Sequence, residues 1–396
     1  MLGYPKTERQ AYLIDLADRL AGPIAERAAE YDRTGKFPFQ NVEDMRQAGY
    51  LAITVPQEYG GFGADPWETA LAQERIARAC GSTALLTTMH LALVGRLGAG
   101  KAWPEEIYAA VCREVIADGA LINTINSEPT LGSPSRGALP STTLVRQSDG
   151  SWRLNGHKSW GSLSPGLTFM SVMCTVVDGD EAPRRSNVLI RASDPGVRIV
   201  ETWNTSGMRA TASHDVLLED IALPADTVLL ADASQDPLRT GGWSLFPSMT
   251  VWYGIAAAAR DCAIDYARNR KPNGLETSIA ELPTIQNRVA EMELKLWQAG
   301  TVLSATAERW QTTPIEERAG MDWEMAATKH TVTNNAIQVT DLAMRVVGAS
   351  AMSRDMPLER YNRDVRAGLG QPPMDDVALT IIGKRALGVS GPPSRS

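Results

Sequence analysis

The stretch TSGMRATASHDVLLEDIALP, residues 205–224, decides the fold class of this chain. Its second half, HDVLLEDIALP, alternates apolar and polar residues, and this period of two predicts a β-strand with one buried face. Similar strand-like segments fill residues 121–230, whereas apolar residues recur at helical spacing on both sides of that region. The sequence therefore predicts an α+β fold with a β-domain between two helical regions.

The changes of period also predict the domain boundaries. The segment STALLTTMHLALVGRLG, residues 82–98, predicts a buried helix, and Asp-Gly and Asn-Gly pairs predict hairpin turns inside the β-domain. Three long helical segments after the β-domain predict a four-helix bundle; they cover residues 249–270, 285–310 and 323–348. The predicted domains are an N-terminal helical domain, a β-barrel or β-sandwich domain and a C-terminal bundle, at residues 1–120, 121–232 and 233–396.

Composition excludes several function classes. The chain has 396 residues, of which 43% are hydrophobic and 21% charged, as in ordinary soluble globular proteins. A net charge of −7 argues against nucleic acid or an anionic membrane as a partner. The four cysteines show no C-x-x-C spacing, so we expect neither a metal site nor a disulfide framework. The charged N-terminal segment and the absence of a long apolar run favour a cytoplasmic protein.

Six stretches together resemble the acyl-CoA dehydrogenase superfamily, and the resemblance runs along nearly the whole chain. Each stretch alone is weak evidence for the resemblance, but the order and spacing of all six make the match specific. They are VPQEYGGFG at 55–63, INSEPTLGS at 125–133, LNGHKSWGS at 154–162, TSGMRATASHDVLLEDIALP at 205–224, YARNRKPNG at 266–274 and PLERYNRDVR at 357–366. The resemblance implies an oxidoreductase that binds FAD, with the isoalloxazine ring between the β-domain and the bundle.

By this resemblance, the β-domain contacts the flavin ring. The Ser127 hydroxyl would donate to the pyrimidine edge, and Ser133 would reach the diphosphate or the pantetheine arm of a substrate. Trp160 would pack on the ring and exclude water, while Ser162 would lie near the reactive nitrogen and tune the ring electronically. Without the neighbouring motifs, Trp160 and Ser162 also fit an ordinary hairpin. The implied cofactor-binding residues of this domain are Asn126, Ser127, Gly132, Ser133, Trp160 and Ser162.

The bundle resembles the part of the family that binds the FAD of a neighbouring subunit. Arg270 and Gly274 match residues at the diphosphate, where a guanidinium can donate two parallel hydrogen bonds. Gln286 matches a glutamine near the adenine, and Gly348 matches the first glycine of a paired-glycine turn, although Ala349 replaces the second. Because these contacts come from a second subunit, the resemblance implies at least a homodimer and favours a tetramer.

The catalytic base of a dehydrogenase is missing from both of its usual places. Dehydrogenases of this family use a glutamate to remove the α-proton of acyl-CoA while hydride leaves the β-carbon. The glutamate nine residues after the equivalent of Arg363 falls on Pro372, and the alternative position on the first bundle helix falls on Ser244. Neither residue takes a proton at neutral pH. Asp375 and Asp376 could substitute, but their place before VALTIIGKRAL favours N-caps of the last helix.

This loss resembles the flavin-dependent monooxygenases of the superfamily, which use reduced flavin to activate oxygen. In these enzymes a serine at the place of Ser162 and a histidine on the final loop support that chemistry. Gln371 or Gly370 stands at the place of the histidine, and Gln371 could donate an amide hydrogen bond. His90, on an otherwise apolar helix, is another candidate, although a lone histidine there is more often a core residue. The predicted catalytic set is therefore Ser162, Gln371 and His90.

Three functions stay open from the sequence. The favoured one is a flavoprotein oxygenase that acts on an acyl-CoA thioester or a small aromatic compound, supplied with electrons by a flavin reductase or another electron-transfer partner. The second is a true acyl-CoA dehydrogenase whose base is displaced to Asp375 or Asp376. The third is a flavin-binding protein without catalytic turnover.

Overall fold

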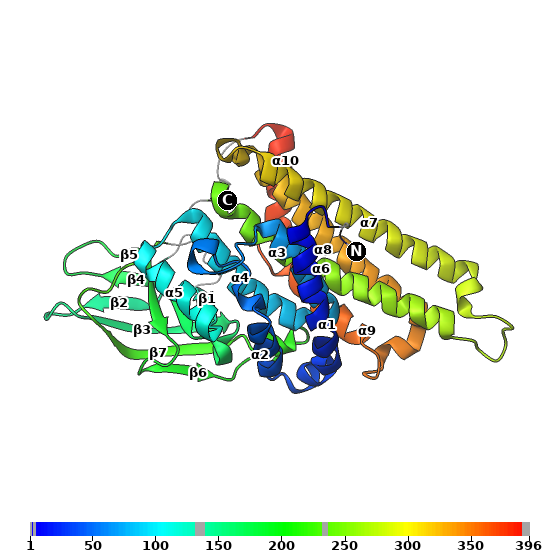
Figure 1. Cartoon of the computed structure of the whole chain (residues 1–396), viewed down its shortest axis with the longest axis horizontal. Helices are drawn as coiled ribbons and strands as arrows, with labels where there is room; N and C mark the ends of the chain where they lie inside the picture. Colours follow the sequence, from blue (N-terminus) through cyan, green and yellow to red (C-terminus); the bar gives the residue numbers. More distant parts are fainter. Residues whose placement is uncertain (1, 3–4, 131–138, 232–236, 390–396) are drawn as a thin grey trace.

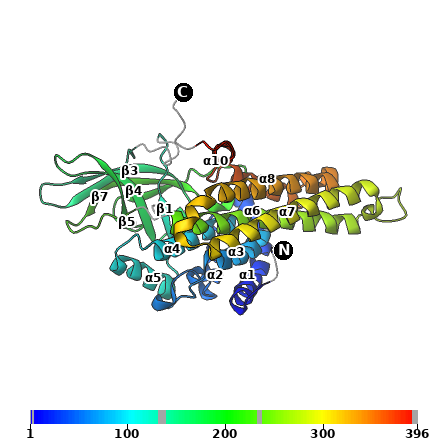
Figure 2. The ribbon, with the colours of Figure 1, turned by 90° about the horizontal axis from the view of Figure 1, so that it is seen from above.

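The molecule is elongated, with the β-domain at one end and a long helical bundle at the other. The computed structural model describes residues 2, 5–130, 139–231 and 237–389. Figures 1 and 2 show the N-terminal helices between the sheet and the outer part of the bundle. This arrangement confirms the predicted α+β class. Among the described residues, no helix is long and apolar enough to cross a membrane.

In the described part of the chain, five α-helices precede the sheet. They are α1 (Glu8–Thr34), α2 (Phe39–Gln47), α3 (Pro66–Ala79), α4 (Gly81–Gly100) and α5 (Glu105–Asp118). Helix α4 is the helix predicted at residues 82–98, and most of its side chains are buried, as its largely apolar sequence requires. It packs against α3 on one side and against the first long helix of the bundle on another.

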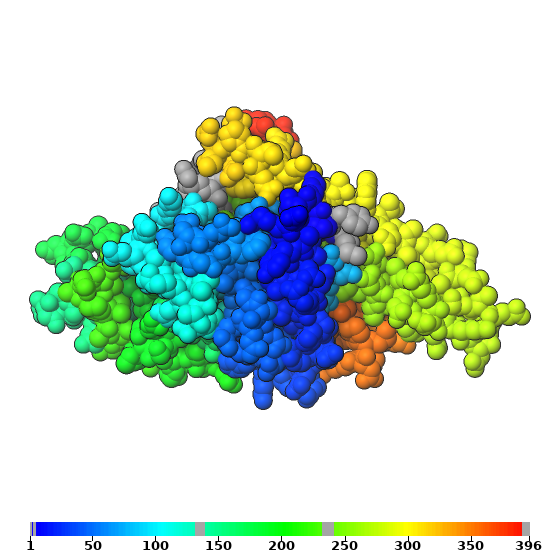
Figure 3. Space-filling model, viewed as in Figure 1, coloured from blue at the N-terminus to red at the C-terminus, as the bar shows by residue number. Residues whose placement is uncertain are grey.

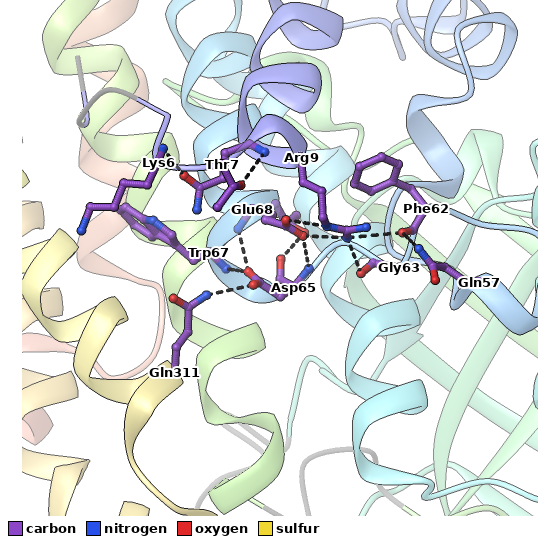
Figure 4. Close-up of polar contacts among 12 residues, drawn as sticks. Lys6, Thr7, Arg9, Gln57, Phe62, Gly63, Asp65, Trp67, Glu68 and Gln311 are labelled. Atoms are coloured by element: carbon purple, nitrogen blue, oxygen red, sulfur yellow. Dashed lines mark hydrogen bonds and ion pairs between the residues drawn. The ribbon is translucent and has the colours of Figure 1, made fainter.

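A polar cluster fastens the N-terminal helices to the bundle (Figure 4). Asp65 caps α3, since its carboxylate accepts from the amide of Glu68 while the Glu68 side chain accepts from the Asp65 amide. Arg9 on α1 donates to both carboxylate oxygens of Glu68, at 2.9 and 3.0 Å, and to the carbonyl of Gly63 at 3.0 Å. Gln311 of the bundle donates to Asp65 at 2.9 Å. One capping site therefore ties together three helices that lie far apart in sequence.

The β-domain is one seven-stranded sheet. Its strands are β1 (Ile122–Ile125), β2 (Thr143–Arg146), β3 (Trp152–Gly161), β4 (Phe169–Val177), β5 (Arg184–Arg191), β6 (Val197–Val200) and β7 (His214–Leu223). The strand order is β1-β4-β2-β3-β7-β6, and β5 also pairs with β4. The β1 and β2 strands run parallel to β4, whereas the other pairs are antiparallel. Strands β1 and β2 pair with successive parts of β4, at residues 169–172 and 175–177, and β3 pairs with β2. The end of β3 therefore lies close to the end of β1.

The hairpin prediction is right for the Asp-Gly pairs and wrong for the Asn-Gly pair. Asp149-Gly150 and Asp178-Gly179 lie in the β2–β3 and β4–β5 connections. Asn155-Gly156 instead lies inside β3, at an irregularity in its pairing with β7. A Cβ at Gly156 would run into the side chain of Thr142, so the glycine here permits a close approach between neighbouring segments.

The C-terminal region is built on three long helices and two short ones. They are α6 (Pro237–Asn269), α7 (Pro283–Thr312), α8 (Asp322–Val347), α9 (Leu358–Asp364) and α10 (Asp375–Leu387). Figures 1 and 2 both place the α6–α7 connection at the end of the molecule away from the sheet. In the space-filling view of Figure 3, this end projects as a yellow-green lobe.

An arginine and an aspartate join α9 to the rest of the molecule. Arg363 donates to both carboxylate oxygens of Asp32 on α1, at 3.1 and 2.7 Å, and to Glu359 at 2.6 and 2.9 Å. The buried Asp364 accepts a 2.6 Å hydrogen bond from the amide of Met208, in the loop before β7. These contacts hold the bundle, the N-terminal helices and the sheet at one junction.

Candidate functional site

Three of the predicted site residues meet at one edge of the sheet. Ser127 follows the end of β1, Trp160 is the penultimate residue of β3, and Ser162 follows that strand directly. The amide of Ser159 donates to the Ser127 carbonyl at 2.9 Å. The side-chain amide of Asn123 donates to the Ser162 carbonyl at 3.1 Å. These two bonds join the ends of β1 and β3, and so fix the three predicted residues as neighbours.

Trp160 presents a flat apolar surface at this edge. Its side chain is 65% exposed, and its backbone φ of +57° lies in the left-handed region that residues other than glycine rarely adopt. Trp203 packs against it edge-on, with ring centroids 5.1 Å apart and an interplanar angle of 78°. The Trp203 indole is fixed in turn by a 3.0 Å hydrogen bond to the Met208 carbonyl. A large exposed indole in a strained backbone conformation is typical of a ligand-binding surface.

Asn126, beside Ser127, carries a buried acceptor. Its Oδ1 has no hydrogen-bond partner among the described residues, although buried polar side-chain atoms are nearly always paired. A planar ligand with an apolar face and a hydrogen-bond donor at its edge would match both Trp160 and this oxygen. A flavin has these properties, so the residues present fit the group that the resemblance implies. Gly132 and Ser133 lie outside the described residues.

A buried ion pair joins the two residues next to Ser159 and Ser127 in the sequence. Lys158 on β3 donates to Glu128 at 2.7 Å, and their side chains are 0% and 1% exposed. Glu128 also accepts from the amides of Ser141 and Thr142, at 2.7 and 3.0 Å, and Lys158 donates to the Met173 carbonyl at 2.6 Å. Burial opposes the charge of Glu128, but the hydrogen bonds from Lys158 and Thr142 hold its pKa below the ordinary value. The pair therefore locks the segment that follows β1 onto β3.

His90 is a structural residue in this geometry. It is fully buried on α4, and its Nδ1 accepts from the amide of Ile122 at 3.2 Å. Its Nε2 must then carry the proton that is donated to the Leu51 carbonyl at 2.9 Å. Because both ring nitrogens have main-chain partners, we leave His90 out of the catalytic set proposed below. Burial lowers its pKa to about 4, so the ring is neutral near pH 7.

This assignment gives His90 a measurable pH dependence. Since its folded pKa lies below its unfolded value of about 6.5, the stability it contributes is present above pH 6.5 and is lost as the pH falls toward 4. We expect the native protein to lose about 2 kcal/mol more free energy of unfolding between pH 7 and pH 5 than His90→Gln does. Urea titrations at the two pH values measure this difference. Equal losses in both proteins would contradict the assignment.

The loop that lacks the base leads directly into α10. Gln371 and Pro372 lie in the turn before this helix, and Met374 is its N-cap residue. The prediction that Asp375 and Asp376 cap the helix is wrong, since the helix begins at Asp375 itself. Both carboxylates lie in the first turn, where the helix dipole stabilises negative charge, and Asp376 Oδ1 accepts from the amide of Val377 at 2.9 Å.

Asp375 is held against the bundle by α8. Its Oδ2 accepts from the Asn334 side chain at 3.1 Å, and its Oδ1 lies 3.8 Å from Nζ of Lys329. Lys329 is 2% exposed, and burial lowers its pKa although Asp375 raises it. Lys329 was not among the predicted site residues; at helical spacing around it lie the apolar residues Met325, Ala326 and Val332. Its isolation on a buried helix face was the available signal.

The predicted bundle residues lie far from the sheet. Arg270 and Gly274 are in the α6–α7 connection, Gln286 is in the first turn of α7, and Gly348 directly follows α8; all four are exposed. A hydrogen bond of 2.9 Å from Arg288 to the carbonyl of Arg345 joins the start of α7 to the end of α8. Figures 1 and 2 place the α6–α7 connection at the opposite end of the molecule from the strands. The two predicted sets of residues are therefore separated within one chain.

Known proteins resemble this chain over nearly its whole length. The family models of the N-terminal, middle and C-terminal domains of acyl-CoA dehydrogenases match residues 7–101, 124–221 and 248–370. The putative acyl-CoA dehydrogenase YdbM of Bacillus subtilis (strain 168) is 39% identical, and the match covers 96% of this chain and 98% of YdbM. The amino sugar nitrososynthase DnmZ of Streptomyces peucetius is 27% identical, with 92% and 90% covered.

A solved structure shares the complete architecture. KijD3 in complex with FMN and dTDP-3-amino-2,3,6-trideoxy-4-keto-3-methyl-D-glucose superposes with a TM-score of 0.85 and 27% identity. The superposition covers 99% of this chain and 97% of KijD3. Both the relatives and this structure thus extend over all three parts of the chain.

Proposed function

The chain belongs to the acyl-CoA dehydrogenase family, and we propose that it acts there as a flavin-dependent oxygenase. As a member of this family, the chain is a flavin-dependent oxidoreductase. The proposal concerns the type of reaction, which is oxygenation and not dehydrogenation. The observation that carries it is the loss of the base, since Pro372 and Ser244 occupy both positions where a glutamate is expected. The carboxylate nearest to Pro372 in sequence, Asp375, is engaged by Asn334 on α8. Neither of these two positions therefore supplies the proton acceptor that dehydrogenation requires.

Each residue of the sheet edge has a role in this proposal. Trp160 would cover one face of the flavin and exclude water, and Asn126 with Ser127 would bind its polar edge. Ser162 would lie at the reactive nitrogen, and Gln371 would donate an amide hydrogen bond from the loop before α10. The flavin itself supplies the two-electron chemistry with oxygen. The exposed indole of Trp160 and the Oδ1 of Asn126, which lacks a hydrogen-bond partner within the described part of the chain, support these assignments.

The proposed cofactor is FAD, held between subunits of a cytoplasmic homo-oligomer that we take to be a tetramer. Arg270 and Gln286 would meet the diphosphate and the adenine side of a partner's FAD. Arg270 and Gln286 lie in the α6–α7 connection and at the start of α7, and this connection is at the opposite end of the molecule from the sheet. Their position supports a site shared between two subunits, because they are separated from Trp160 of their own chain. Leu294 and Trp297, one turn apart on α7, are 58% and 68% exposed, and such an apolar face suits an interface with a second copy.

The substrate is proposed by class. An acyl-CoA thioester and a small aromatic compound fit the family and its oxygenase branch. The nitrososynthase relatives add a nucleotide-linked amino sugar, whose amine would be the oxygenated group. A separate flavin reductase would supply electrons in each case.

An oxygen-transfer experiment tests the reaction type. The flavin-loaded protein is reduced without air and mixed with isotopically labelled oxygen and each candidate substrate. We expect labelled product with one of them, and only slow reduction of the flavin by acyl-CoA thioesters in the absence of oxygen. Flavin bleaching by an acyl-CoA at the rate of an ordinary dehydrogenase would contradict the proposal.

A dehydrogenase with a displaced base is the second candidate. The name of the relative YdbM favours it, and Asp375 is a carboxylate that stands three residues after Pro372 in the chain. In that case Asp375→Asn or Asp376→Asn abolishes bleaching by substrate. Unchanged bleaching in both variants would exclude this candidate, and absence of turnover with any reductant or acceptor would favour a silent flavin-binding protein.

A further inference from the structure

A row of hydroxyl groups runs inward from Ser162. Its Oγ lies 2.8 Å from Oγ of Ser213, which lies 2.9 Å from Oγ1 of Thr211. Thr211 in turn donates to the main-chain carbonyl of Met208 at 2.9 Å. Thr211 and Ser213 are 1% and 5% exposed, whereas Ser162 is only partly buried. The row therefore has a buried end at a carbonyl and an open end at the sheet edge beside Trp160.

The carbonyl sets the direction of every bond in this row. A carbonyl oxygen can only accept, and if Thr211 did not donate, two oxygens would face each other at 2.9 Å in a buried place. The single proton of Thr211 is thus committed, so Thr211 must accept from Ser213. Ser213 has then used its own proton and must accept from Ser162. The Ser162 proton points inward, and its oxygen lone pairs face outward.

We propose that Thr211 and Ser213 are positioning residues that fix Ser162 as a hydrogen-bond acceptor, and that the site thereby favours reduced flavin over oxidised flavin. This inference rests on the proposed function, which places the reactive flavin nitrogen at Ser162. That nitrogen carries a hydrogen in reduced flavin, but in oxidised flavin it has only a lone pair. An accepting serine pairs with the first form and repels the second. The preference suits an enzyme whose reduced flavin must wait for oxygen.

Breaking the row should weaken the preference for reduced flavin. In Ser213→Ala, the Ser162 hydroxyl loses its inward acceptor and is free to turn outward and donate. In Thr211→Val, Ser213 is released and can donate to Ser162, which again turns the Ser162 proton outward. A neutral hydrogen bond contributes about 0.5–1.5 kcal/mol, so we expect binding of reduced relative to oxidised flavin to weaken by roughly threefold to tenfold in each variant.

The readout is the midpoint potential of the bound flavin, measured by equilibration with a reference dye in the absence of air. Both variants should show a lower potential, and Thr211→Ser should restore the native value. Ser164→Ala is the matched control, because its hydroxyl donates to the Ala212 carbonyl at 3.1 Å, in the same region but outside the row. In a Ser162→Ala background, Ser213→Ala should have no further effect, since the row then has no outer end.

The outcomes separate this inference from the proposed function. Potentials of flavin-loaded Ser213→Ala and Thr211→Val that equal or exceed the native value would overturn the role of the row and leave the oxygenase proposal standing. A native protein that binds no flavin would remove the proposed function itself. If Thr211→Val does not fold, Ser213→Ala and the Ser162→Ala background decide the question, since each of these substitutions removes a single hydroxyl and leaves the rest of the side chain in place.

Discussion

Replacement of Lys158 by methionine is expected to lower the free energy of unfolding by about 3–5 kcal/mol. The substitution removes the ammonium that lies 2.7 Å from Glu128 and leaves a buried carboxylate without its countercharge. It also removes the donor to the Met173 carbonyl. The two amide donors from Ser141 and Thr142 remain, but they do not neutralise a full charge in a place that water does not reach. The segment that carries Ser127 should loosen, and flavin affinity should fall with it.

Urea unfolding at a fixed flavin concentration measures this effect. Arg153→Met is the matched control, because Arg153 is on the same strand, 40% exposed, and pairs with an Asp220 side chain that is 73% exposed. Such a surface pair contributes less than about 1 kcal/mol. Adding Glu128→Gln to Lys158→Met should recover most of the loss, since the charge is removed while an acceptor for the amides stays. A Lys158→Met protein as stable as the control variant would show that the pair is not needed.

The sequence predicted the long elements well and one boundary poorly. Helices α7 and α8 follow clear periods of 3.6 and lie within two residues of the predicted segments. Helix α6 begins at Pro237, well before the predicted start at residue 249. The prediction started late because Pro247 and the glycines before it are typical of a break in a helix. In the fold these glycines are covered by Trp310 of α7, and a Cβ at Gly242 would lie 2.7 Å from its Nε1. Tertiary packing, which no local pattern shows, explains the glycines there.

The part of the site that could be predicted from the sequence consists of motif residues at the ends of strands. Ser127, Trp160 and Ser162 lie together because β1 and β3 end at the same edge. The ion pair of Lys158 with Glu128 and the hydroxyl groups that Ser162 contacts were not predicted, because the partners in each case come from distant segments. Lys158 does occupy an inward position of an alternating strand, which is a usable signal for a buried pair. The link from Ser162 to Ser213 depends on how β3 meets the start of β7, and only the fold supplies it.

Arg270→Ala is expected to fold normally and to lose FAD. In the proposed oligomer the guanidinium of Arg270 donates to the diphosphate of a partner's cofactor, and a charge-assisted hydrogen bond contributes about 1.5–3 kcal/mol. Its loss should weaken FAD binding by roughly tenfold to a hundredfold. Arg270 is exposed in the α6–α7 connection, so its removal should leave the free energy of unfolding of the protein without cofactor unchanged.

Gel filtration with absorbance detection of protein and flavin tests this result, and calorimetric titration with FAD gives the affinity. Arg268→Ala removes the same charge from the exposed last turn of α6 and should keep its cofactor. FMN has no diphosphate and no adenosine, so its affinity should be equal in native protein and Arg270→Ala. Full FAD occupancy in Arg270→Ala, or a native protein that runs as a flavin-loaded monomer, would contradict the assignment. Native protein isolated with FMN would overturn it as well, because Arg270 would then have no phosphate of a partner's cofactor to bind.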